Sequence, residues 1–190
     1  MGLVLASGSP RRKELLEMLR VRDLRIIPAV GEEKTDPGLP PDKIVEALSR
    51  AKVEEVAPKC APDDVVVAAD TIVWADGRVF GKPADAAMAA AMLRTLSGRG
   101  HQVYTGVTVI GPRGEDTRVE QSEVFFRRLS ASEIDAYIKT GEPMDKAGAY
   151  GAQGRAALFV ERIEGDFFNV MGLPLCTLGK MLAGQGVDLL

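Results

Sequence analysis

The stretch Val65-Val-Val-Ala-Ala-Asp-Thr-Ile-Val-Trp74 decides the fold class, because its first five residues form an unbroken apolar run. A strand has this composition when both faces of its sheet are covered, which is typical of α/β proteins. Asp70 ends the run, and strand ends are where open α/β sheets present catalytic groups. Burying a carboxylate here is unfavourable without a partner or a function. We therefore expect Asp70 to be a metal ligand or a general base, with an ordinary Asp-Thr turn as the alternative.

Other expected elements surround this stretch. A short buried strand over 3–6 leads to a helix that opens at Ser9-Pro10, and a second helix is expected over 42–57. The rest of the chain predicts, in order, a hairpin across Ala75-Asp-Gly-Arg78, a helix closed by Gly98, antiparallel strands over 103–109 and 119–126, a helix with a capping box from Ser130 to Glu133, and a strand over 157–160. We expect one α/β domain over 1–190, with a mixed sheet, flanking helices and two lobes around a cleft.

Composition excludes several classes of function. The 190 residues carry a net charge of −3, which argues against a protein that binds a long nucleic acid. The apolar start is too short for a signal peptide, and nothing in the chain is long enough to span a membrane, so we expect a cytoplasmic protein with no membrane partner. Cys60 and Cys176 are expected to be free thiols.

Cations gather in two places. The sequence Ser7-Gly-Ser-Pro-Arg-Arg12 lies between a strand and a helix start, where backbone amides and the arginines Arg11 and Arg12 could cradle a triphosphate. The alternative is a helix cap with solvated arginines. Lys52 falls within the apolar face of its helix. A lysine at such a position usually extends its ammonium past the apolar side chains to water, and the alternative is a cation that binds phosphate.

Glu33, Lys82 and the pair Asp145-Lys146 are weak candidates individually, because charges beside Gly and Pro are usually solvated. Together they supply what hydrolysis of an α–β phosphoanhydride needs, namely carboxylates for a divalent ion, cations for the departing pyrophosphate and a base for water. The single histidine, His101, is interpreted as a residue at the start of a strand, since one histidine and two separated cysteines make no zinc site.

Longer motifs resemble one family. They occur in order along the chain: Leu5-Ala-Ser-Gly-Ser-Pro-Arg-Arg12, Ala69-Asp-Thr71, Gly81-Lys-Pro83, His101-Gln-Val-Tyr-Thr-Gly106, Glu142-Pro-Met-Asp-Lys-Ala-Gly-Ala-Tyr-Gly151, Gln153-Gly154 and Asn169-Val-Met-Gly-Leu-Pro174. They resemble the Maf nucleoside triphosphate pyrophosphatases over residues 5–174. The seven-residue match from Asp145 to Gly151 is far more specific than any single charge.

The resemblance implies an elongated, two-lobed α/β fold with a central cleft, like the inosine triphosphate pyrophosphatases. It also implies a divalent metal, Mg²⁺ or Mn²⁺, and a homodimer. The roles that it implies are these: Asp70 as the base that activates water, Glu33 and Asp70 near the metal, and Ser7, Arg11, Arg12, Lys52 and Lys82 on the phosphates.

The combination of Arg12, Thr71 and Gln153 resembles the family branch that hydrolyses dTTP and UTP. A carboxamide at Gln153 can donate to and accept from a uracil edge at once. Ala152 departs from the larger aliphatic residue usual in the family, which could widen the base pocket toward modified pyrimidine nucleotides. The alternatives are a 7-methyl-GTP pyrophosphatase and a nucleotide-binding regulator of septum formation without turnover.

Overall fold

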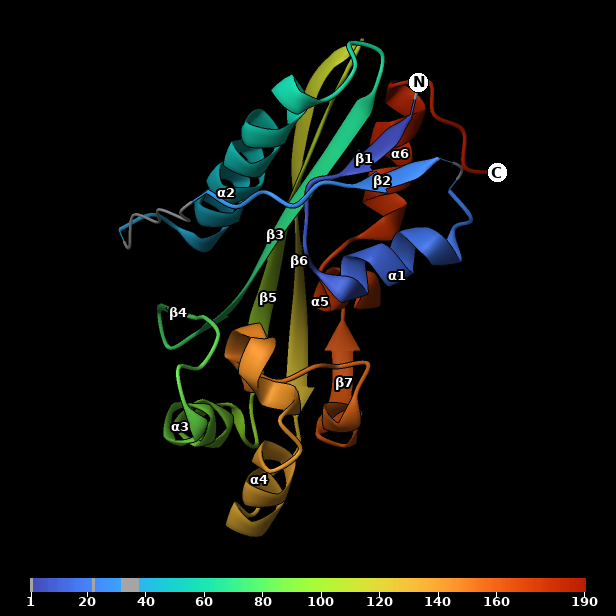
Figure 1. Cartoon of the computed structure of the whole chain (residues 1–190). Helices are drawn as coiled ribbons and strands as arrows, with labels where there is room; N and C mark the ends of the chain where they lie inside the picture. Colours follow the sequence, from blue (N-terminus) through green and yellow to red (C-terminus); the bar gives the residue numbers. More distant parts are fainter. Residues whose placement is uncertain (1, 22, 32–37) are drawn as a thin grey trace. The chain divides into compact units, whose positions relative to one another are not determined.

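The protein is described by a computed structural model that covers residues 2–21, 23–31 and 38–190 (Figure 1). In these residues one sheet has the strand order β2-β1-β3-β5-β6-β7, with β4 paired to β3. The strands are β1 (Leu3–Leu5), β2 (Leu24–Ile26), β3 (Val65–Ala75), β4 (Arg78–Phe80), β5 (Gly100–Gly111), β6 (Gly114–Phe126) and β7 (Val160–Glu164). The strand β1 is parallel to β2 and β3, whereas β4 and β7 are antiparallel to their partners β3 and β6.

Helices flank this sheet, so the expected α/β class with a mixed sheet is confirmed. The α-helices are α1 (Pro10–Met18), α2 (Pro41–Val56), α3 (Ala86–Leu96), α4 (Ala131–Ile138), α5 (Phe167–Met171) and α6 (Leu175–Gly184), and the short 3-10 turns are η1 (Ala57–Lys59), η2 (Glu142–Asp145), η3 (Ala147–Ala149) and η4 (Arg155–Leu158). No helix in the described part of the chain is long and apolar enough to cross a membrane.

The chain forms two compact units. Unit 1 comprises Met1–Asp70, Thr105–Glu120 and Gly172–Leu190, and unit 2 comprises Thr71–Tyr104 and Gln121–Met171. The single domain expected over 1–190 stays a prediction, which one cooperative unfolding transition would support.

Helices cover both faces of the sheet in unit 1. Successive residues of an extended chain alternate between faces, so Val4 of β1 and Ala6, just after β1, point the same way as Val66 and Ala68 of β3. These four side chains are buried against Val53 and Val56 of α2. In Figure 1, α1 and α6 lie on the side of the strands away from α2. The next residue of β3 on the same face as Val66 and Ala68 therefore also points toward α2.

The strand expected over 65–69 is longer than predicted. β3 runs without interruption from Val65 to Ala75, so Asp70 lies inside the strand and the Asp-Thr turn is wrong. The strand continues because Ile72, Val73 and Ala75 remain buried on either side. The expected hairpin is confirmed, since Ala75 pairs with Arg78 across a two-residue turn whose residues Asp76 and Gly77 both have positive φ.

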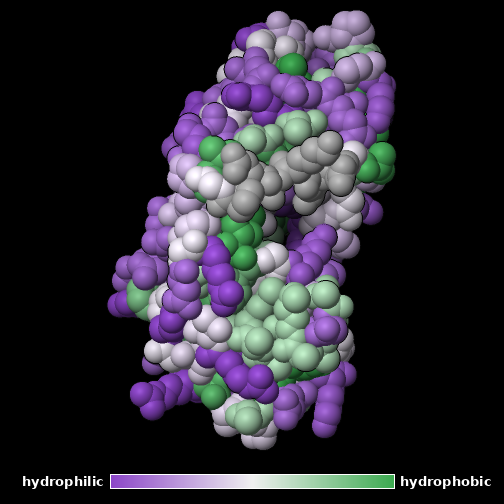
Figure 2. Space-filling view, turned by 90° about the vertical axis from the view of Figure 1, so that its left-hand side faces the viewer, coloured by the Kyte–Doolittle hydropathy of each residue, from purple (hydrophilic) through white to green (hydrophobic). Residues whose placement is uncertain are grey.

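Unit 2 has its own aromatic core. Its members come from β3, β4, β5, β6, the helices α3 and α4, the glycine-rich loop 141–154 and the segment 156–159 that follows it. They include Phe80, Leu93, Phe126, Tyr137, Tyr150 and Phe159. The outward face of α3 is alanine-rich and forms the pale green area over that helix in Figure 2. The capping box that starts α4 is present with both of its hydrogen bonds.

The segment after the glycine-rich loop differs from expectation. The strand expected over 157–160 begins only at Val160, because Arg155–Leu158 form the turn η4. The loop itself is partly apolar, since Ala149, Tyr150 and Ala152 belong to the core of unit 2. Ala152 is 7% exposed, so the departure from a larger aliphatic residue falls in this core. These three side chains anchor the loop to the core of unit 2.

Candidate active site

Asp70 and Lys52 form an ion pair on the α2 face of the sheet in unit 1. Asp70 lies two residues after Ala68 on β3, so strand alternation directs its side chain toward α2. Lys52 extends from α2, next to the buried Val53, and its Nζ donates to Asp70 Oδ1. The two side chains are 16% and 10% exposed. Lys52 therefore meets a carboxylate instead of snorkelling to water, and each charge offsets the desolvation of the other.

The loop between β1 and α1 holds Arg12 in a fixed position. The Ser7 hydroxyl accepts hydrogen bonds from Ser9 N and from Arg12 Nη1, both at 3.2 Å. Arg12 Nε donates to Gly172 O at 2.7 Å. The alternative interpretation, a helix cap with solvated arginines, therefore does not hold for Arg12. The Ser9 side chain makes no capping hydrogen bond among the described residues. Arg11 is half-buried in the first turn of α1, where helix amides favour an anion.

The loop that holds Arg12 follows β1, and the ion pair includes Asp70 on the neighbouring strand β3. In the parallel pair β1 and β3, Leu5 is opposite Val67, and Ala6 N donates to Val67 O at 2.7 Å. Ser7 therefore follows β1 next to the residues of β3 that directly precede Asp70. Unit 1 thus gathers five of the expected residues, namely Ser7, Arg11, Arg12, Lys52 and Asp70.

Unit 2 holds three further expected residues: Thr71, Lys82 and Gln153. Thr71 follows Asp70 on β3 and is half-buried, whereas Lys82 and Gln153 are exposed. The glycine-rich loop adjoins the segment of Lys82, because Gly148 N donates to Gly81 O at 3.1 Å. A Cβ at Gly148 would lie 2.9 Å from Val73 Cγ2, so this contact needs glycine.

Glu33, the remaining expected residue, lies outside the described residues. The chain before it is attached to α2, since the amides of Val30 and Gly31 donate to the Glu55 carboxylate at 2.9–3.2 Å. These backbone hydrogen bonds lower the pKa of Glu55. Glu55 is on the same helix as Lys52, so one element carries the lysine and holds the segment that leads to Glu33.

His101 has a structural position in unit 2. It is 3% exposed, and its Nε2 lies 2.8 Å from the Tyr150 hydroxyl. Burial is the main cause that lowers the pKa of His101 to about 4, so the ring is neutral at pH 7. The interpretation of His101 as a residue at the start of a strand is confirmed, because β5 begins at Gly100.

Two groups that shape these sites were not foreseen from the sequence. The carbonyl of Gly172 accepts a hydrogen bond from Arg12, which is 160 positions away in the sequence. Because the acceptor is a backbone atom, no side-chain type in the sequence could indicate it. The Glu142 carboxylate accepts hydrogen bonds from Tyr137 and from the amide of Arg155. Glu142 precedes a proline and has the local sequence of a solvated loop charge, so only its place in a family motif singled it out.

A parallel strand, a strand-to-helix loop with arginines and an adjacent Lys-Asp pair together define an α/β protein suited to a phosphorylated ligand. The model of the family described as Maf-like protein matches residues 2–185. The chain belongs to the Maf family.

Relatives agree with this assignment. A dTTP/UTP pyrophosphatase of Moorella thermoacetica is 53% identical, over 98% of this chain and 96% of the relative. Another protein of that name, from Geobacillus, is 51% identical over 91% of this chain and 92% of the relative. The solved structure of the Staphylococcus aureus Ham1 protein is 15% identical, covers 97% of this chain and 100% of its own, and has a TM-score of 0.55. This last similarity concerns the fold alone.

Proposed function

We propose that this protein hydrolyses dTTP and UTP to the monophosphate and pyrophosphate. The observation that carries the proposal is the ion pair of Lys52 with the buried Asp70, beside the loop of Ser7 and Arg12. The dTTP/UTP pyrophosphatases of Moorella and Geobacillus, at 53% and 51% identity, support the same reaction and substrates.

In the proposed reaction, Asp70 is the general base. Its carboxylate orients a water molecule and accepts a proton from it while the water oxygen bonds to the α-phosphorus. The bond between that phosphorus and the bridging oxygen to the β-phosphate breaks, and pyrophosphate leaves. Lys52, whose ammonium lies at Asp70, neutralises charge on the phosphates as the bond breaks.

The remaining cations bind the triphosphate. Arg12 presents a guanidinium already held by Ser7 and Gly172, so little rotational freedom is lost when a phosphate binds. Ser7, Arg11 and Lys82 complete the proposed phosphate ligands. For the choice of base we propose Arg12, Thr71 and Gln153, with the Gln153 carboxamide hydrogen-bonding to the uracil or thymine edge.

A divalent cation, Mg²⁺ or Mn²⁺, belongs to this proposal. The described residues contain no group of three or more His, Cys, Asp or Glu side chains that could enclose a metal. Mg²⁺ is often held by only one or two carboxylates, together with water and substrate phosphates. Asp70, a buried carboxylate beside a phosphate-binding loop, fits this mode, and Glu33 would be the second carboxylate. When bound, the ion supplies positive charge to the phosphates.

The test is pyrophosphate release from dTTP, UTP, CTP, GTP and 7-methyl-GTP with Mg²⁺ or Mn²⁺. We expect turnover of dTTP and UTP by the wild type and a loss of about 10³-fold or more in Asp70→Asn, which keeps the shape of the side chain but not its basicity. Unchanged hydrolysis by a folded Asp70→Asn variant would contradict the role of the base. Turnover of 7-methyl-GTP alone, or binding of dTTP without turnover, would favour the alternative functions.

We further propose that the protein is a cytoplasmic homodimer. This proposal rests on the resemblance to the Maf family. Light scattering of the purified chain and cell fractionation test its two parts separately.

A further inference from the structure

Gln153 is held between two hydrogen-bonded backbone amides in unit 2. On one side, Gly151 N donates to the Tyr137 hydroxyl at 3.3 Å. On the other, Arg155 N donates to Glu142 Oε2 at 3.1 Å. The Tyr137 hydroxyl in turn donates to Glu142 Oε1 at 2.9 Å. One carboxylate therefore holds both ends of the segment 151–155, one end directly and the other through Tyr137.

The fit of this segment around Glu142 is close. A Cβ at Gly154 would lie 2.2 Å from Glu142 Oε1, so the backbone could not approach the carboxylate with any other residue at this position. The backbone carbonyl of Glu142 also accepts a hydrogen bond from Lys146 Nζ at 2.8 Å. Gly151 packs against the same lysine, since its Cβ would lie 2.7 Å from Lys146 Cε. Gly154 thus lies against the Glu142 carboxylate, and Gly151 lies against the lysine that binds the Glu142 carbonyl.

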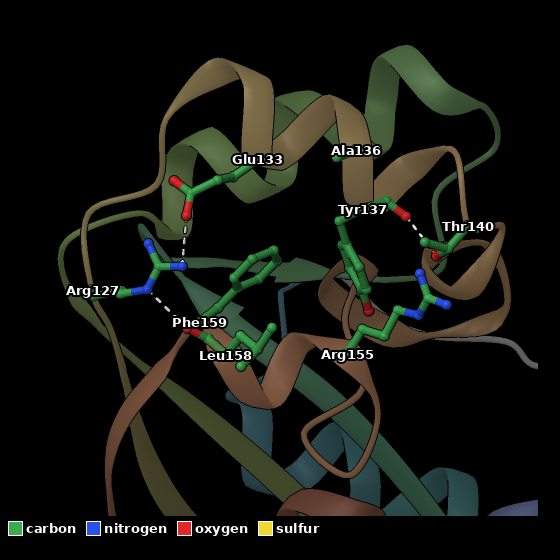
Figure 3. Close-up of a pocket in the computed structure, with 8 residues that line it drawn as sticks. All are labelled: Arg127, Glu133, Ala136, Tyr137, Thr140, Arg155, Leu158 and Phe159. Atoms are coloured by element: carbon green, nitrogen blue, oxygen red, sulfur yellow. Dashed lines mark hydrogen bonds and ion pairs between the residues drawn. The ribbon is translucent and has the colours of Figure 1, made fainter.

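Gln153 itself is exposed, whereas its neighbour Ala152 is buried in the core of unit 2. In Figure 3, Tyr137 extends from α4 toward the segment of η4 that carries Arg155. Burial, and then the hydrogen bond to Glu142, raise the pKa of Tyr137, so the hydroxyl stays protonated and can donate. The backbone is fixed on both sides, while the carboxamide points outward.

We propose that Glu142 is a positioning residue for substrate choice: with Tyr137, it holds the backbone of 151–155 so that the Gln153 carboxamide is presented in one orientation. This inference rests on the proposed role of Gln153 in reading the pyrimidine base. Glu142 acts through the loop and touches neither the phosphates nor the water. Its removal therefore affects binding of the base and not the chemical step.

The first experiment compares kcat and KM for UTP and GTP in wild type and in Glu142→Ala. One hydrogen bond to the loop and one to Tyr137 are lost, each with a modest net contribution. We expect the preference for UTP over GTP to fall about tenfold through KM for UTP, with kcat changed less than about twofold. Glu142→Gln, which keeps one acceptor, should restore part of the preference.

Non-additivity gives a sharper test. If Glu142 acts only through Gln153, Glu142→Ala should reduce the preference no further when Gln153→Ala is already present. Additive losses, or an unchanged preference in a folded Glu142→Ala variant, would overturn the inference.

Glu133→Ala is the matched control. Glu133 is another carboxylate of unit 2 with backbone and arginine partners. Among the described residues its hydrogen bonds go to Arg127 and Ser130 and not to 151–155. Its loss should lower stability without changing the UTP preference. Should Glu142→Ala not fold, Tyr137→Phe removes only the hydroxyl between Glu142 and Gly151, and a smaller loss of preference in the same direction is expected.

Hydrogen exchange separates this inference from the proposed function. Faster exchange at the Gly151 and Arg155 amides in Glu142→Ala, with the α4 amides unchanged, would support the positioning role whether or not the wild type hydrolyses UTP. An inactive wild type would contradict the proposed function alone. Unchanged exchange at both loop amides would overturn the positioning role.

Discussion

Unit 1 and unit 2 hold their candidate functional residues by different means. In unit 1, Asp70 and Lys52 come from a strand and a helix, and opposite charges bring them together. In unit 2, Gln153 stands on a loop that backbone amides, a tyrosine and Glu142 hold in place. Regular elements with paired charges suit phosphate chemistry, whereas a loop fixed through its backbone leaves a neutral amide available to read a base. The two units should therefore respond differently to substitution.

Lys52→Met should have the largest of these effects. It removes the ammonium at Asp70 while keeping the apolar stem on α2, and we expect kcat/KM for UTP to fall 10²- to 10³-fold, roughly 3–4 kcal/mol. Steady-state kinetics with UTP measure this loss. Lys43→Met on the same helix is the control, because Lys43 is 56% exposed and pairs with Glu46. Equal losses in both variants would contradict a specific role for Lys52.

His101 should make the stability of unit 2 depend on pH. Its folded pKa of about 4 is below the ordinary value of 6.5, so below pH 6.5 the unfolded chain takes up a proton that the folded chain does not. Stability is complete above pH 6.5 and decreases as pH falls to about 4, by up to about 3 kcal/mol at about 1.4 kcal/mol per pKa unit. Urea unfolding of wild type and His101→Gln should show this difference disappear in the variant. Parallel pH curves for the two proteins would contradict it.

Gly106→Ala should weaken unit 1 through its backbone. A Cβ at Gly106 on β5 would lie 2.2 Å from Val45 O of α2, so the helix that carries Lys52 must move. We expect a loss of about 2 kcal/mol in the free energy of unfolding, together with reduced turnover. Gly179→Ala in α6 is the control, since its Cβ would meet nothing within 4 Å and alanine favours a helix. A Gly106→Ala variant as stable as the wild type would refute the close approach.

Ser130→Ala should have the smallest effect, and comparing it with Ser9→Ala tests whether the N-caps of α4 and α1 contribute differently to stability. The Ser130 side chain caps α4 in unit 2, so its loss should lower stability by about 1 kcal/mol. Ser9 occupies the N-cap position of α1 in unit 1 without a described side-chain cap bond, and Ser9→Ala should cost only a few tenths of a kcal/mol by that route. Thermal unfolding of the two variants measures the difference, and equal losses would show that the caps are equivalent.

Local patterns were sufficient for most elements, including α2, the β3-β4 hairpin and the capping box of α4, because each depends on neighbours within a few residues. They were insufficient for the C-terminal end of β3 and for Arg155–Leu158. The strand continues past Asp70 because Lys52 meets its charge and most of the strand residues after it are buried. The turn η4 forms where the chain packs on an aromatic core assembled from distant segments.

The sequence by itself determined the α/β class, the family and the identity of the candidate residues, because apolar periodicity and long motifs are properties of neighbouring residues. Only the tertiary structure decided which of them meet. Lys52 with Asp70, Arg12 with Gly172, and Glu142 with Arg155 are separated by 18, 160 and 13 positions. Their contacts depend on where helices and loops pack against the sheet, which is a property of the whole chain and not of any local stretch.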